Sequence, residues 1–340
     1  MKSILKGFPK WALVTIIVVA VVAICVSVVA LVISSALSQD QDSRRFSGPS
    51  TPYIARISVV GEISGVSNRF ASSNSAYHHS WTLQTIDTLI ADSYNKGICL
   101  WLDTPGGAVY ESDELYLKLM EYKEKTGRPI YAYMKKIAAS GGYYVASSAD
   151  EVFANRNAWT GSIGVSIGTM FDYSEFLEEH GIRTVTIVSG NNKAMGNKYE
   201  PLTDEQKAIY QSLVDDAYGR FVDIVAKGRG MTDAEARKVA DGRLLTAGQA
   251  LDSGLIDDIM GERDAEQKIM ALVDGSPAIH DCYYRPSTNY FSLFGTALYE
   301  GQGLLNRDRV YEGDVAAVLE LARQQEEAGI PPIKYLYEGW

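Results

Sequence analysis

The sequence predicts an α/β protein in which a layered domain follows one N-terminal transmembrane helix. Short, β-branched apolar runs alternate with stretches of helical spacing from residue 53 to about residue 203, which is typical of an α/β layer fold. Residues 203–273 are helical in pattern. The membrane helix is predicted because no charged residue occurs between Trp11 and Gln39, and about 20 apolar residues cross a bilayer core.

The N-terminal region predicts a single-pass cell-membrane protein. Lys2, Lys6 and Lys10 precede the apolar run, and positive residues stay on the cytoplasmic side. We therefore expect a cytoplasmic segment at 1–10, an anchor at 11–38, a polar linker at 39–52 and an extracytoplasmic domain. The apolar run is too long for a signal peptide, although the "SSALS" stretch leaves cleavage open.

Composition excludes several classes of function. The chain has 340 residues, 46% of them apolar, and a formal net charge of -10 without a basic block in the domain, which argues against nucleic acid. Its three cysteines are scattered and form no C-x-x-C pair, so neither a disulfide framework nor a thiolate metal site is expected. No metal or nucleotide motif occurs, so no cofactor is expected.

The expected elements follow from local patterns. The expected strands cover residues 53–63, 97–107, 129–135, 151–157, 162–168 and 183–190, and the expected helices in this part cover 82–95, 108–125 and 173–180. Capping boxes then begin three helices, at Thr203 with Gln206, Thr232 with Glu235 and Thr246 with Gln249. One apolar face of the first of these helices consists of Ile209, Leu213, Val214, Ala217, Phe221 and Ile224. A C-terminal extension at 275–340 contains a short amphipathic helix at 313–328 and the tail "IPPIKYLYEGW".

The stretch "IAASGGYY" (137–144) raises the question of chemistry. Ser140 stands between an apolar run and an expected helix, so it is either a helix N-cap or a nucleophile. A nucleophilic serine needs a base, and the four histidines lie in loops or at a helix end, where we expect surface residues (His78, His79, His180 and His280).

A lysine can replace histidine as the base when desolvation lowers its pKa toward neutrality. Lys193 fits, because it follows the run 183–190 and no acid lies between Arg183 and Glu200; Lys198 is a weaker candidate, and a solvated loop lysine is the alternative for each. Backbone N–H donors for an oxyanion are offered by the turn "DTPGG", which ends at Gly107, and by Gly141, although an ordinary turn would look the same.

Taken together, "DTPGG", "AASGGYY", "TGSIGV", "SGNNK" and "GRLLTAGQALDSGLID" resemble the bacterial signal peptide peptidase A family of serine–lysine peptidases. The resemblance implies a Clp-protease/crotonase-like fold with a repeated ββα core over residues 53–274. It implies that Ser140 is the nucleophile, Lys193 the general base and Ser162 the residue that orients the lysine amine, with Gly107 and Gly141 as the oxyanion hole. The sequence departs from the family in "DTPGG", where "NSPGG" is common, and in the residues after Lys193.

The implied activity is cleavage of membrane-held peptides such as remnant signal peptides, with apolar and small side chains preferred, by a ring-shaped homo-oligomer. Whether Ser140 and Lys193 of one site come from the same chain is left open. The alternatives are a non-catalytic, membrane-tethered assembly protein with the same fold and a crotonase-like acyl-CoA enzyme. The apolar tail either packs on a neighbouring subunit, frays or enters the peptide groove.

Overall fold

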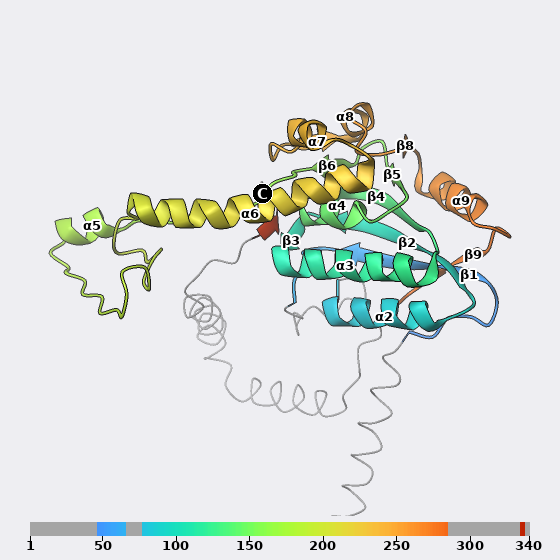
Figure 1. Cartoon of the computed structure of the whole chain (residues 1–340), viewed down its shortest axis with the longest axis horizontal. Coiled ribbons are helices and arrows are strands. Elements are labelled where there is room, and N and C mark those ends of the chain that lie inside the picture. Colours follow the sequence, from blue (N-terminus) through green and yellow to red (C-terminus); the bar gives the residue numbers. More distant parts are fainter. Residues whose placement is uncertain (1–45, 66–76, 285–333, 337–340) are drawn as a thin grey trace, which may run out of the picture. The chain divides into compact units, whose positions relative to one another are not determined.

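The computed structural model of the chain describes residues 46–65, 77–284 and 334–336 (Figure 1). The expected cytoplasmic segment, the anchor at 11–38 and the helix at 313–328 lie outside these residues. Within the described ranges, no helix is both long enough and apolar enough to cross a bilayer.

The domain is built around a mostly parallel sheet, which confirms the predicted α/β class. The six strands on the main path are, in spatial order, β7 (Leu244–Thr246), β6 (Trp159–Gly161), β4 (Ile130–Ala139), β2 (Asn95–Thr104), β1 (Tyr53–Val60) and β9 (Ala278–Asp281). Two further strands lie off this path: β5 (Glu151–Ala154) pairs with β4, and β8 (Asp258–Ile259) pairs with β5. The pairing of β6 with β7 is antiparallel, and the other pairs of this sheet are parallel.

Helices cover both faces of this sheet. The helices α2 (His79–Ala91), α3 (Val109–Thr126) and α4 (Gly141–Ala146) pack on one face, where their apolar side chains join those of β1, β2 and β4 in the main core. The helix α9 (Glu262–Leu272) packs on the other face around Trp101, Tyr133 and Phe153. Strands buried on both faces read as continuous apolar runs, as residues 98–102 of β2 do.

Most element boundaries follow local signals. The first helix runs from 79 to 91 rather than from 82 to 95, because β2 begins at Asn95. The helix α3 ends at Gly127, whose left-handed φ of 66° favours glycine. All three capping boxes are confirmed, at the starts of α6 (Asp204–Arg229), α7 (Asp233–Val239) and α8 (Ala247–Asp252).

Two strand predictions are wrong. Residues 162–168 form no strand, because Gly161 (φ 80°) and Ser162 (φ 48°) turn the backbone as soon as β6 ends. Residues 183–190 also form none: Val185 is 84% exposed and Ile187 is 93% exposed, and no described strand pairs with them. They belong to a segment, residues 167–203, that includes the short helix α5 (Ser174–Glu179) and that we call the arm.

The helix α6 belongs half to the core and half to the arm. Its C-terminal half buries Ala217 and Phe221, whereas Leu213 of the same apolar face is 46% exposed. Figure 1 shows α5 and the N-terminal half of α6 extending past the sheet. The predicted apolar face of this helix is therefore covered along only part of its length.

Candidate active site

Ser140 lies at the junction of β4 and α4, where the backbone is strained. Its residue is 1% exposed, and its φ of 53° and ψ of -118° are unusual for a residue with a Cβ. Two hydrogen bonds hold it there, from its N–H to the Gly161 carbonyl (2.8 Å) and from the Tyr144 N–H to its carbonyl (2.9 Å). Such a conformation costs about 1–3 kcal/mol and is typical of functional sites. The Ser140 side chain makes no capping bond, so the N-cap interpretation is not supported.

Glycines after Ser140 permit the sharp entry into α4. A Cβ on Gly142 would lie 2.7 Å from the Thr104 methyl group, so only glycine lets the helix approach the end of β2 this closely. Gly141 is the first residue of α4, and its N–H therefore has no acceptor within the helix.

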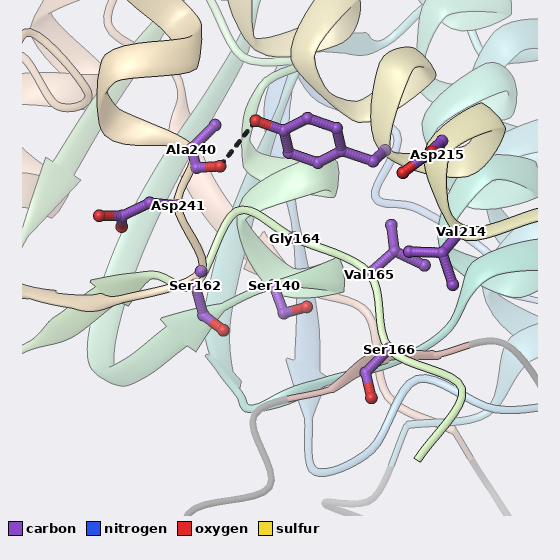
Figure 2. Close-up of a pocket in the computed structure, with 11 residues that line it drawn as sticks. Ser140, Ser162, Gly164, Val165, Ser166, Val214, Asp215, Ala240 and Asp241 are labelled. Carbon is purple, nitrogen blue, oxygen red and sulfur yellow. Dashed lines mark hydrogen bonds between the residues drawn. The ribbon is translucent and has the colours of Figure 1, made fainter. Parts of the chain in front are cut away.

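Ser162 is held beside Ser140 by a similar turn. It is 7% exposed and has a positive φ of 48°, and its N–H donates to the Arg243 carbonyl (2.7 Å) just before β7. Figure 2 shows the two serines facing one pocket, of about 400 Å³. The residues that line it are Ser140, Ser162, Gly164, Val165, Ser166, Val214, Asp215, Tyr218, Ala240, Asp241 and Gly242.

Gly107 lies in the short strand β3 (Gly106–Ala108), which contacts Ile63 on one side and a segment of the C-terminal tail on the other. On one side, the Ile63 N–H donates to the Gly106 carbonyl (2.8 Å) and the Ala108 N–H donates to the Ile63 carbonyl (2.9 Å). A trans peptide directs its N–H away from its C=O, so the Gly107 N–H points to the opposite side. A Cβ on Gly107 would collide with Ile63, which explains the need for glycine.

The opposite side of β3 is paired with part of the C-terminal tail. The strand β10 (Lys334–Leu336) lies antiparallel to β3, with Tyr335 opposite Gly107. An extended peptide therefore fits along the β3 edge that carries the Gly107 N–H.

Lys193 is not brought to this pocket. It lies in the turn at 191–196 of the arm, is exposed and does not line the pocket. Lys198 is exposed in the same segment. Of the predicted site residues, the structure thus brings Ser140, Gly141 and Ser162 together near the strand that carries Gly107, and it leaves Lys193 apart.

The histidines do not serve Ser140, since none of them lines its pocket. The expectation of surface histidines is wrong for His79, which is 8% exposed. Its ring lies 2.6 Å from the Tyr77 hydroxyl and 2.7 Å from the Glu114 carboxylate, so burial is offset by two polar contacts. Burial also raises the pKa of the Cys99 and Cys282 thiols, which disfavours the reactive thiolate.

Sequence reasoning missed one wall of the pocket. The Tyr218 hydroxyl on α6 donates to the Ala240 carbonyl (2.8 Å) and so ties α6 to the turn that leads to Arg243 (Figure 2). The spacing of Val214, Asp215 and Tyr218 marks them as one face of the helix, but nothing local shows that this face meets a serine.

Comparison with known proteins identifies the class of enzyme. Residues 122–275 match peptidase family S49. A putative signal peptide peptidase SppA from Enterococcus faecium is 36% identical over 260 residues, which are 76% of this chain and 74% of the relative. The putative protease slr0021 of Synechocystis is 34% identical, over 66% of this chain and 76% of that protein. A ClpP1 mutant from Listeria monocytogenes is similar in structure, with a TM-score of 0.40, 15% identity, and coverage of 62% of this chain and 92% of that one.

The chain therefore belongs to peptidase family S49 and is a serine peptidase related to SppA. The predicted resemblance is confirmed, and so is the predicted enzyme class.

Proposed function

We propose that the protein is an endopeptidase that uses Ser140 as nucleophile and Lys193 as general base to cleave peptides held at the membrane, such as signal peptide remnants. The observation that carries this proposal is the strained, buried position of Ser140 beside a pocket that it shares with Ser162. The name of the E. faecium relative supports the substrate class.

Each proposed residue has a defined chemical task. The neutral Lys193 amine, oriented by the Ser162 hydroxyl, removes the Ser140 proton as the Ser140 oxygen attacks the peptide carbonyl. The N–H groups of Gly107 and Gly141 stabilise the oxyanion. The Lys193 ammonium then gives its proton to the leaving amine. The neutral Lys193 amine next deprotonates a water molecule, which hydrolyses the acyl-enzyme.

We further propose that Lys193 acts on Ser140 of a neighbouring copy in a ring-shaped homo-oligomer. The lysine lies on the exposed arm, and no lysine lines the Ser140 pocket within the described residues. The arm also exposes apolar side chains that association would bury, among them Phe171 and Phe176 at 57% each. Burial at such an interface disfavours the charged form of a lysine side chain. A lysine that acts as a base has to be in the neutral amine form.

The substrate is proposed to bind as an extra strand on β3. Main-chain hydrogen bonds to a strand edge are a common mode of peptide recognition, and β10 already pairs there. The tail accordingly competes with substrate, and deletion of residues 331–340 should raise the initial rate of peptide cleavage. An unchanged rate together with an unchanged oligomeric state would contradict the proposal that the tail occupies the peptide groove.

The anchor at 11–38 is proposed to hold the domain outside the cytoplasmic membrane within a linker's reach of the bilayer. Tethering raises the effective concentration of membrane-held peptides. Deletion of residues 1–38 should release the protein from the membrane fraction and reduce cleavage of bilayer-embedded peptides more than cleavage of a soluble peptide.

Mixing two inactive variants tests the shared site. Ser140→Ala and Lys193→Ala should each lose at least ~1,000-fold in kcat, because members of one catalytic unit are each required. Mixed oligomers of the two should recover roughly a quarter of wild-type activity, since random assembly pairs an intact serine with an intact lysine at that share of sites.

Two results would contradict these assignments. Full activity of the Lys193→Ala variant would refute the lysine as base. Inactive mixtures, with subunit exchange demonstrated by labelled chains, would place both residues of a site in one chain. Lys198→Ala is the matched control, because it alters a neighbouring exposed lysine of the arm.

A further inference from the structure

The helix α6 contributes a carboxylate, that of Asp215, to the lining of the Ser140 pocket, and the proposed mechanism gives it no role. Val214 and Asp215 precede Tyr218 by four and three residues on α6, and all three line the pocket. Figure 2 shows Val214 and Asp215 on the α6 side of this pocket. Val165 contributes to the same lining from the segment after Ser162. The pocket thus combines apolar side chains with a carboxylate, and Ser140 lines the same pocket.

The charge lining this pocket is negative. Asp215 and Asp241 line it, and no lysine or arginine does so within the described residues. Asp241 is compensated, because the Arg243 guanidinium bonds to it (2.8 Å between Nε and Oδ1) and lowers the pKa of its carboxyl. Asp215 accepts a hydrogen bond from the Gln211 amide (2.7 Å), and among the described residues it forms no salt bridge. Among the described lining residues, Asp215 is therefore the carboxylate that lacks a salt-bridge partner.

We infer that Asp215 selects substrates with a lysine or arginine side chain at one position next to the scissile bond. The aliphatic stem of such a side chain packs against Val165 and Val214, and its cationic end pairs with the Asp215 carboxylate. Long basic side chains bury their methylene groups in this way while the charge stays near water. The inference rests on the proposed function, and it adds a basic preference to the apolar and small side chains that the family resemblance implies.

Two series of peptides that differ by one ammonium test the inference. Each series carries lysine or its uncharged isostere norleucine at a single position, and the position is moved from three residues before the scissile bond to two residues after it. At one position the wild-type protein should cleave the lysine peptide about tenfold better in kcat/KM than the norleucine peptide, because substrate selection reflects differential binding of the transition state. Asp215→Asn should reduce that ratio about tenfold, to near one.

Asp216 is a matched control on the same helix. Its carboxylate pairs with Arg220 one turn along α6, and it does not line the pocket. Asp216→Asn removes the same charge from a neighbouring position and should leave the lysine-to-norleucine ratio unchanged. Asp215→Lys should reverse the preference, toward a glutamate peptide over its glutamine counterpart.

The outcomes separate this inference from the proposed function. A wild-type ratio near one at every position would overturn the role of Asp215, and so would an equal effect of Asp215→Asn on both peptides. A pH profile shifted alike for both peptides would instead place the Lys193 ammonium of a neighbouring copy opposite Asp215, which also overturns the inference. Cleavage that survives Ser140→Ala would refute the proposed function itself.

Discussion

The strand β1 and the arm residues 183–190 have similar sequence patterns but differ in burial and in strand pairing. Both are short runs rich in β-branched residues, "YIARISVV" and "RTVTIVSG". In β1, Ile57 and Val59 are fully buried and pair with Leu100 and Leu102 of β2. In the arm, Val185 and Ile187 are almost fully exposed and no described strand pairs with them.

This difference shows that a strand pattern indicates a segment suited to strand pairing but does not indicate which segment pairs with it. An extended segment is stable only when its backbone groups pair and its apolar face is covered. The described residues supply both for β1 and neither for the arm. The proposed shared site predicts that a second copy covers the arm.

Charging the exposed face of the arm should have the largest effect. The double variant Val185→Asp, Ile187→Asp should be monomeric and lose at least ~100-fold in kcat/KM, because charges at the centre of an apolar interface oppose association. Thr186→Asp is the control, since alternate residues of an extended segment face opposite sides. Sedimentation and peptide cleavage measure both, and an active oligomer of the double variant would disprove the assigned partner.

Truncating one isoleucine in each region should separate core from arm in stability. Ile57→Ala should reduce the free energy of unfolding by about 2–5 kcal/mol, because it opens a cavity in the core. Ile187→Ala should change it by less than about 0.5 kcal/mol in a monomeric background, as expected for an exposed site. Urea denaturation in the Val185→Asp background, which keeps Ile187, makes the comparison, and comparable losses would mean that the arm packs within its own chain.

The bond between α6 and the site should have a smaller effect. Tyr218→Phe removes the hydrogen bond to the Ala240 carbonyl, which is worth about 0.5–1.5 kcal/mol. We expect kcat to fall by about three- to tenfold, because the turn that follows Ala240 carries the Arg243 carbonyl that holds Ser162. Unaltered kcat at unaltered stability would show that Ser162 keeps its place without this bond.

The smallest effect concerns acid stability at the β1 edge. The Arg56 guanidinium on β1 bonds to Asp281 on β9 and lowers the pKa of that carboxyl below its ordinary value of 3.8. The contribution to stability is therefore complete above the ordinary value and is lost as the pH falls through the lower native value. Tm should fall between pH 5 and pH 3 more in the wild type than in Arg56→Gln, as calorimetry would measure, and equal slopes would exclude this pair as a cause.

The parts of the molecule that were predictable from sequence depend on short-range chemistry. The capping boxes at Thr203, Thr232 and Thr246 were predictable because each donor and acceptor lie within three residues. The buried strands were predictable because their apolar runs are long enough to be covered on both faces.

The remaining features depend on partners that are distant in the chain or outside it. His79 is buried because Tyr77 and Glu114 receive its ring, and Asp215 lines the pocket because Phe221 and Ala217 dock the far half of α6 on the core. The motif marks Ser140 as a candidate nucleophile, whereas its positive φ was not predictable, because the Gly161 carbonyl that holds its N–H is distant in the chain.

The β3 edge that pairs with β10 restricts the shape of the substrate under the proposed binding mode. Ile63 pairs with one edge of β3, so a substrate peptide is expected to pair along the other edge in an extended conformation. The amides of a helix form hydrogen bonds within that helix, so under the proposed function a helical peptide has to unwind before it pairs with this edge. The proposed binding mode therefore predicts that compact folded proteins are cleaved more slowly than unfolded peptides.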